Sequence, residues 1–100
     1  MPTVYVTAPE SAAAELAERL VDERLAACVN AVDCRSTYRW EGEVTTDNET
    51  ILLIKTTDEG YHRLVERVEE LHPYEVPCIE RFEKANVADR FGAWIAESVD

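Results

Sequence analysis

Apolar residues along the chain change their spacing at several points, and these changes predict the order of strands and helices. Residues 3–8 are mostly β-branched or aromatic and are followed by Pro9, which predicts a short buried strand. Between residues 11 and 26 the apolar positions recur every three or four residues and form one helical face. We therefore predict a helix here, with Glu10 and Ser11 at its start, where a negative charge favours the helix dipole.

A long extended segment follows at residues 28–44. Its alternation places Tyr38 and Trp40 on one face and Arg39 on the other. As one straight strand it would span about 56 Å at about 3.3 Å per residue, whereas a domain of this length is only about 34 Å across. The segment is therefore either broken, around Asp33 where a polar residue interrupts the pattern, or its far end extends past the domain and lies against another subunit.

The second half of the chain again alternates between strand and helix patterns. Polar residues 45–49 predict a turn, and the apolar run at 50–56 predicts a central strand that completes a long hairpin with the preceding segment. A second helix is expected over residues 58–71, and Thr56 with Glu59 resembles a capping box at its start.

The last part of the chain predicts one more strand and one more helix. Residues 77–83 alternate and predict a strand near the edge of a sheet, and Asn86 with Asp89 is expected to cap a helix over 87–99. The buried side of that helix is expected to include one of three large residues, Phe91, Trp94 or Ile95.

The resulting order is βαββαβ with an extra C-terminal helix, all in a single domain spanning residues 1–100. This order predicts an α+β, ferredoxin-like sandwich, in which right-handed crossovers place both main helices on the same face of an antiparallel sheet. The other sheet face then needs a cover. The terminal helix is too short to shield all of it, so association between subunits is the simplest way to bury it.

Charge limits the class of partner. The chain has 21 acidic residues against 10 basic ones and a net charge of -11. A surface that binds nucleic acid needs clustered lysine and arginine, so nucleic acid is not expected as a partner. The acidic surface has two interpretations, which the composition leaves open: adaptation to a salty cytoplasm, or a surface that attracts cations.

The cysteines and the N-terminus bear on the compartment. Cys28, Cys34 and Cys78 form no C-x-x-C pair, and an odd number of cysteines argues against a disulfide framework. The N-terminal residues lack the basic lead and apolar stretch of a secretory leader, and no apolar run is long enough to span a membrane. We therefore expect a soluble, cytoplasmic protein with reduced thiols and no membrane partner.

His72 is the main candidate for chemistry. Pro73 turns the chain there, and Glu75 and Cys78 follow within reach, so an imidazole, a carboxylate and a thiol could offer a cation mixed ligands. Alternatively, His72 caps the last carbonyls of its helix. His62 is interpreted as an exposed polar position. The chain has no nucleophile elbow, glycine-rich phosphate loop or H-E-x-x-H motif, so no enzymatic activity is expected.

Four short segments together carry a specific resemblance. They are residues 25–30 (LAACVN), 38–42 (YRWEG), 53–56 (LIKT) and 71–77 (LHPYEVP). In this order and at these separations they resemble the CutA divalent-cation tolerance proteins over nearly the whole chain. The resemblance implies a ferredoxin-like subunit similar to the PII signalling proteins. It further implies a homotrimer in which the long hairpins pair with neighbouring subunits. This trimer would have no enzymatic activity and would take part in the response to divalent metal ions.

The resemblance also implies roles for individual residues. Tyr38 and Trp40 are assigned to the hairpin between subunits, and His72 is the best metal contact. Copper-binding members of the family carry a cysteine before the Thr-Ala-Pro turn and a histidine beside His-Pro-Tyr, whereas this chain has Val6 and Leu71 there. Of the copper-ligand positions of the family, only that of His72 keeps its ligand in this chain. Copper or another divalent cation is the candidate ligand, and no cofactor is required.

A second hypothesis makes the trimer a PII-like sensor of a small molecule. The ligand would bind in clefts between subunits, which are common places for ligand sites. Arg39, Tyr74 and Glu75 are the residues expected to converge there.

Overall fold

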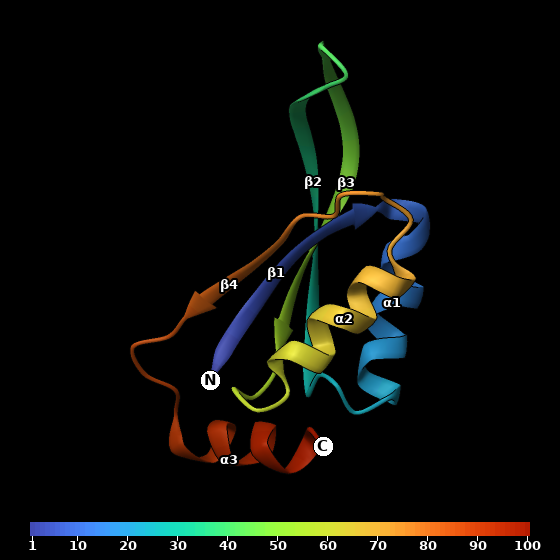
Figure 1. The fold of residues 1–100 in the computed structure, drawn as a ribbon. Coiled ribbons are helices and arrows are strands. Elements are labelled where there is room, and N and C mark those ends of the chain that lie inside the picture. Colours follow the sequence, from blue (N-terminus) through green and yellow to red (C-terminus); the bar gives the residue numbers. More distant parts are fainter.

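Strands and helices alternate in the order β1, α1, β2, β3, α2, β4, α3 in a computed structural model that describes residues 1–100 (Figure 1). The strands lie in the order β2-β3-β1-β4, and each neighbouring pair is antiparallel. The predicted α+β, ferredoxin-like order with an extra C-terminal helix is confirmed. The bounds are Pro2–Pro9 for β1, Glu10–Asp22 for α1, Cys28–Trp40 for β2, Glu43–Lys55 for β3, Tyr61–Leu71 for α2, Ile79–Glu83 for β4 and Asp89–Ser98 for α3.

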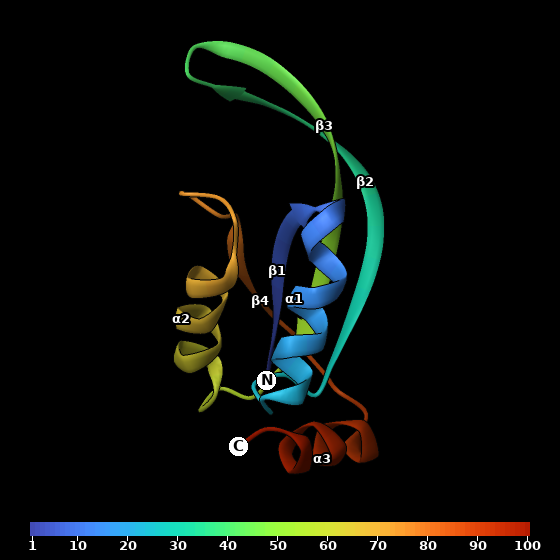
Figure 2. The same ribbon diagram turned by 90° about the vertical axis from the view of Figure 1, so that its right-hand side faces the viewer.

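The main core lies between one face of the sheet and the two helices α1 and α2 (Figures 1 and 2). Alternate residues of β1 point into it, because successive side chains of a strand point to opposite faces. Helical spacing likewise brings one side of α1 and one side of α2 to the same core. The buried residues of this core are Val4, Val6, Ala8, Ala13, Leu16, Leu20, Ala26, Leu52, Ile54, Leu64 and Val68.

The helix α1 ends earlier than its apolar pattern predicts. The pattern continues to residue 26, but the helix ends at Asp22. Arg24 has a positive φ of 60°, and the N–H of Glu23 donates a hydrogen bond to the carbonyl of Arg19 at 2.9 Å. A left-handed residue just past the last turn is a common way for a helix to end. The apolar residues that follow still reach the core, because the chain turns back toward β2.

The predicted capping box before α2 is wrong in its residues. Thr57, and not Thr56, bonds the start of the helix: the N–H of Gly60 donates to Thr57 Oγ1 at 3.0 Å. The hydroxyl of Thr56 donates instead to the carbonyl of Leu25 at 2.8 Å. The helix starts at Tyr61, later than predicted, because these threonine bonds hold the preceding residues in a turn.

The helix α3 lies across one end of the sheet and leaves most of its open face uncovered (Figure 1). Of its three large residues, only Ile95 is fully buried, in a small second cluster. Phe91 and Trp94 are exposed and stack with ring centroids 5.6 Å apart. The predicted cap at Asn86 is wrong, because the residue before the first turn is Ala88 and no side chain caps this helix.

The strands β2 and β3 form one continuous hairpin, and neither predicted irregularity is present. The strand β2 runs through Asp33 without a break. The turn lies at Glu41 and Gly42, both with positive φ (50° and 82°), as a tight two-residue hairpin turn requires. The predicted turn at residues 45–49 is wrong: these residues belong to β3. Residues 45–48 are polar where the hairpin is open to solvent, whereas Glu49 is buried.

The far half of the hairpin extends past the rest of the sheet (Figure 2). The strand β1 pairs with β3 only as far as Glu49, so residues 43–48 pair with β2 alone. The subunit measures 45 × 26 × 20 Å, which is long for a domain of its size. Of the two predicted alternatives, a broken strand or an overhanging one, the structure has the overhanging one. We call residues 35–48, the part beyond the third strand, the ribbon.

Replacing Gly60 by alanine is expected to destabilise the protein by about 1–3 kcal/mol. The new Cβ would lie 2.9 Å from Val99 Cγ1 and 3.1 Å from Thr57 Oγ1. Gly92→Ala is the matched control, because its Cβ would meet nothing closer than 3.6 Å and alanine favours a helix interior by about 0.5–1 kcal/mol. Urea unfolding measures both changes. Equal stability of the two variants would contradict this packing at the start of α2.

Candidate functional site

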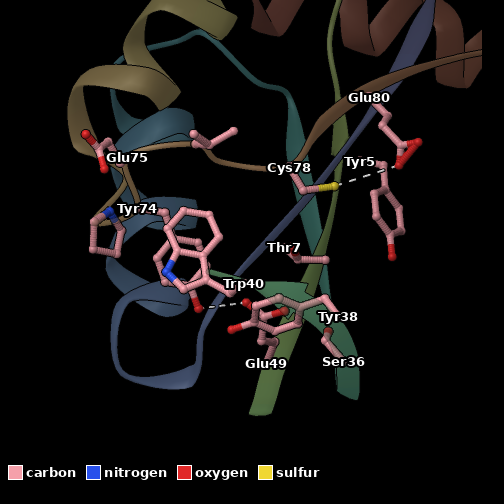
Figure 3. Close-up of a pocket in the computed structure, with 12 residues that line it drawn as sticks. Tyr5, Thr7, Ser36, Tyr38, Trp40, Glu49, Tyr74, Glu75, Cys78 and Glu80 are labelled. Atoms are coloured by element: carbon pink, nitrogen blue, oxygen red, sulfur yellow. Dashed lines mark hydrogen bonds between the residues drawn. The ribbon is translucent and has the colours of Figure 1, made fainter. Parts of the chain in front are cut away.

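A cavity of about 580 Å³ lies on the sheet face that α1 and α2 leave open (Figure 3). Tyr5 and Thr7 form part of its wall, and they alternate along β1 with the buried Val4 and Val6. The ribbon and the loop that follows α2 form its other walls. The complete lining is Tyr5, Thr7, Ser36, Tyr38, Trp40, Glu49, Pro73, Tyr74, Glu75, Val76, Cys78 and Glu80.

Glu49 is the most deeply buried acidic group of the cavity. It lies where the ribbon leaves the sheet, opposite Pro9 of β1 and Cys34 of β2, and it is only 4% exposed. The hydroxyl of Tyr74 donates a hydrogen bond to Glu49 Oε2 at 2.8 Å. Burial, and then this bond to the carboxylate, raise the pKa of Tyr74 far above its ordinary value. The phenol of Tyr74 therefore stays neutral where it donates to Glu49.

His72 holds the loop after α2 against β1. Its Nε2 lies 2.8 Å from the carbonyl oxygen of Thr7, and its Nδ1 lies 3.1 Å from the backbone nitrogen of Tyr74. A carbonyl only accepts and an amide N–H only donates, so Nε2 carries the proton and Nδ1 accepts. The ring is therefore neutral, 7% exposed and hydrogen-bonded at both nitrogens.

The alternative prediction, that His72 caps the end of its helix, holds for its backbone but not for its ring. The bond to the end of α2 comes from the backbone, where the N–H of His72 donates to the carbonyl of Val68 at 2.8 Å. The ring instead positions Tyr74, and its centroid lies 4.9 Å from that of Tyr74. His72 thus acts on the cavity through Tyr74 and Glu49, and it does not itself line the cavity.

The cavity brings together five of the residues that the sequence singled out, Tyr38, Trp40, Tyr74, Glu75 and Cys78. Arg39 is not among them, because alternation turns it to the opposite face of β2, where its Nη1 donates to the carbonyl of Gly42 at 3.2 Å. The predicted convergence of Arg39 with Tyr74 and Glu75 therefore does not occur within one subunit.

Sequence reasoning missed Glu49 and the residues of β1. Glu49 was assigned to a turn, although it continues the alternation of Ile51 and Leu53 on the open sheet face. Tyr5 and Thr7 also carried a signal, because they alternate with small apolar residues in a strand predicted to be buried. Following the period of two to the ends of both strands would have found all three.

The described residues do not form a metal centre within one subunit. No group of three histidine, cysteine, aspartate or glutamate residues is placed to hold an ion. Val6 is buried in the core and Leu71 packs against it, so neither position supplies a donor atom. His62 is exposed on α2 beside Tyr61. A metal contact at His72 stays a prediction. For Nδ1 to bind an ion, its hydrogen bond from the backbone N–H of Tyr74 must first break.

The strand order and the two helices on one face define a ferredoxin-like α+β protein with a long hairpin. Residues 2–98 match the family described as CutA1 divalent ion tolerance protein, and the chain belongs to this family. The chain is 42% identical to the divalent-cation tolerance protein CutA of Thermotoga maritima over 100 residues, which cover 99% of each protein. It is 46% identical to that of Thermus thermophilus over 97 residues, which cover 95% of this chain and 94% of the relative.

Solved structures agree with this assignment. CutA of Pyrococcus horikoshii, crystallised in guanidine hydrochloride, superposes with a TM-score of 0.96 at 37% identity, covering all of both chains. The PII-like protein CutA from Nostoc, in its apo form, superposes with a TM-score of 0.94 at 33% identity, covering 98% of this chain and 97% of the other.

The compartment differs among relatives. The Arabidopsis thaliana relative, 40% identical over 95% of this chain and 53% of its own length, is named chloroplastic, and the solved structure from Archaeoglobus fulgidus is named periplasmic. No helix of this chain combines the length and apolar character needed to cross a bilayer. The predicted cytoplasmic location stays a prediction.

Tyr74→Phe removes the one hydrogen bond donated to Glu49 and is expected to lower the free energy of unfolding near neutral pH by about 1–2 kcal/mol. Because folding raises the pKa of Tyr74, this contribution is fully present below about pH 10, the ordinary tyrosine pKa. It is lost as the pH rises through the higher folded-state pKa. The stability difference from wild type should therefore shrink in strongly alkaline solution.

Tyr61→Phe is the control, because the Tyr61 hydroxyl makes no hydrogen bond in this subunit. Urea unfolding near neutral pH and again above about pH 10 measures both variants against wild type. A Tyr74→Phe difference that stays constant over this range would contradict the described pairing with Glu49.

Proposed function

We propose that the protein is a non-enzymatic homotrimer that takes part in the response to divalent cations. The observation that carries the assembly is the ribbon, whose two strands have no third strand beside them. Membership in the CutA1 divalent ion tolerance family supports the link to cations. The acidic surface, with a net charge of -11, is suited to attract them.

A ribbon of this kind favours pairing with other copies. An isolated two-stranded hairpin is marginally stable in water, and its outer backbone groups form a template for another strand. The ribbon also exposes apolar side chains, with Trp40 at 48% and Val44 at 66% exposure. The strand β4 is a second open edge. A ribbon on one side and an open edge on the other favour a closed ring of head-to-tail contacts, with Tyr38 and Trp40 at the interface.

The absence of enzymatic activity is inferred from the state of the nucleophiles. The Cys78 thiol lies 3.7 Å from Glu80 Oε1, and burial raises the pKa of Cys78 above its ordinary value. Its sulfur is therefore protonated at neutral pH. His72, the one buried imidazole, is hydrogen-bonded at both nitrogens and does not contact a thiol.

In this proposal His72 is the residue that contacts the metal ion. The ion is copper or another divalent cation, and the protein needs no resident cofactor. An imidazole nitrogen binds a soft or borderline metal ion better than a hard one. Further ligands would come from neighbouring subunits. We place the protein in the cytoplasm, where its three free cysteines would stay reduced.

Light scattering in high salt tests the assembly. The expected mass is three times the 11.3 kDa of the chain at micromolar concentration. Trp40→Ala is expected to weaken association more than tenfold, because truncation of a central interface tryptophan costs about 2 kcal/mol or more. Val21→Ala, at an exposed apolar position on α1, is the control and should leave the mass unchanged. A monomeric wild-type mass would contradict the proposed trimer.

Titration with Cu(II) tests the metal contact. The tightest binding phase is expected to disappear in His72→Ala and to persist in His62→Ala, in which an exposed histidine is removed instead. Thermal melts of both variants report whether they fold. Matching isotherms for wild type and a folded His72→Ala would remove His72 from the metal site, and they would leave the trimer unaffected.

A further inference from the structure

The cavity on the open sheet face carries an excess of negative charge. Three of its lining residues are carboxylates, Glu49, Glu75 and Glu80, and none is lysine or arginine. The arginine ion pairs of the subunit lie elsewhere, with Glu23, Asp58, Glu70, Glu83 and Asp100. An anionic ligand that enters this cavity would meet electrostatic repulsion.

Glu49 gives this charge a precise location. Glu49 is only 4% exposed, and its one hydrogen bond is donated by the hydroxyl of Tyr74 to Oε2. Oε1 accepts no hydrogen bond from the chain and is not sealed from solvent, so it is open to a donor in the cavity that Glu49 lines. Burial of a carboxylate is costly unless a donor or a positive charge compensates it. The free oxygen therefore favours a cationic N–H donor in the cavity.

Aromatic rings surround this carboxylate. Tyr5, Tyr38, Trp40 and Tyr74 all line the cavity, and Figure 3 shows Trp40, Tyr38 and Tyr74 grouped around Glu49. The face of an aromatic ring attracts a cation, most strongly for tryptophan. The same rings offer apolar surface to a hydrocarbon chain. Trp40 retains 48% exposure, which leaves part of it for an interface with another subunit.

We propose that this cavity binds an alkylammonium cation. An ammonium N–H donates to Glu49 Oε1, and the hydrocarbon part packs on the rings of Trp40 and its neighbours. A bare metal ion fits less well, because no three ligand side chains converge. An anion would be repelled, and a neutral molecule would leave the carboxylate uncompensated. Every residue that lines the cavity belongs to one chain, and His72 is not among them. Tyr38 and Trp40 are also assigned to the proposed interface, so amine binding and assembly involve neighbouring surfaces and are measured separately.

Tryptophan fluorescence provides the test. The chain has two tryptophans, Trp40 in the cavity and Trp94 on α3, so Trp94→Phe leaves Trp40 as the reporter. This protein is titrated with n-butylammonium and with 1,4-diaminobutane at neutral pH and low salt. A saturable change in Trp40 emission is expected with both amines, and no change is expected with n-butanol, which has the same carbon chain without the charge.

Two substitutions in the Trp94→Phe background locate the charge. Glu49→Gln keeps an acceptor for Tyr74 and is expected to weaken amine binding by at least about tenfold, because a hydrogen bond to a charged group is lost. Glu69→Gln is the control: it removes the same charge from an exposed position on α2 outside the cavity, and it should leave binding unchanged. Circular dichroism confirms that both variants are folded.

The proposal is overturned if the amines cause no saturable change, if butanol acts equally, or if both glutamate variants bind alike. It is also overturned if MnCl₂ displaces the amines from wild type and binds more tightly, which would make the cavity an inorganic cation site. Light scattering on the same samples reports the oligomeric state separately. Failure of amine binding can therefore be distinguished from failure of assembly.

Discussion

Beyond Glu49 the β2–β3 hairpin has no third strand, so the outward backbone groups of the ribbon have no partner within the subunit. Backbone N–H and C=O groups are obligatory hydrogen-bonding groups, and an exposed pair of strands satisfies only half of them internally. This constraint makes the ribbon, which extends the chain to 45 Å and exposes Trp40 and Val44, the segment best suited to pair with another copy.

The candidate site depends on the same ribbon. Tyr38 and Trp40 form one wall of the cavity, and the loop held by His72 forms the opposite wall. The bond between Tyr74 and Glu49 joins the two where the ribbon leaves the sheet. The proposed assembly and the proposed ligand binding would therefore involve adjacent surfaces, so a ligand that binds better to the assembled form would favour assembly.

Periodicity predicted most of the fold because the core residues repeat it. The valines of β1 alternate and the core leucines of α1 and α2, Leu16, Leu20 and Leu64, recur at helical spacing, and all of them are buried. Prediction failed where polarity had two possible causes. Residues 45–48 are polar because the ribbon is open to solvent, and Glu49 is polar because it faces the cavity, but a turn would equally explain this run of polar residues. The bond from Thr56 to Leu25 and the pairing of Tyr74 with Glu49 join residues far apart in the sequence, so no local spacing rule could find them.

The central claim is that neighbouring copies of the chain complete the ribbon, and amide hydrogen exchange tests it most directly. The outward-facing amides of residues 43–48 are the informative groups, because no strand of their own subunit accepts their hydrogen bonds. If other copies pair with them, they exchange at least about a hundredfold more slowly than in an unfolded peptide, as paired strands do. Exchange of these amides at the rate of an unfolded peptide would contradict the account.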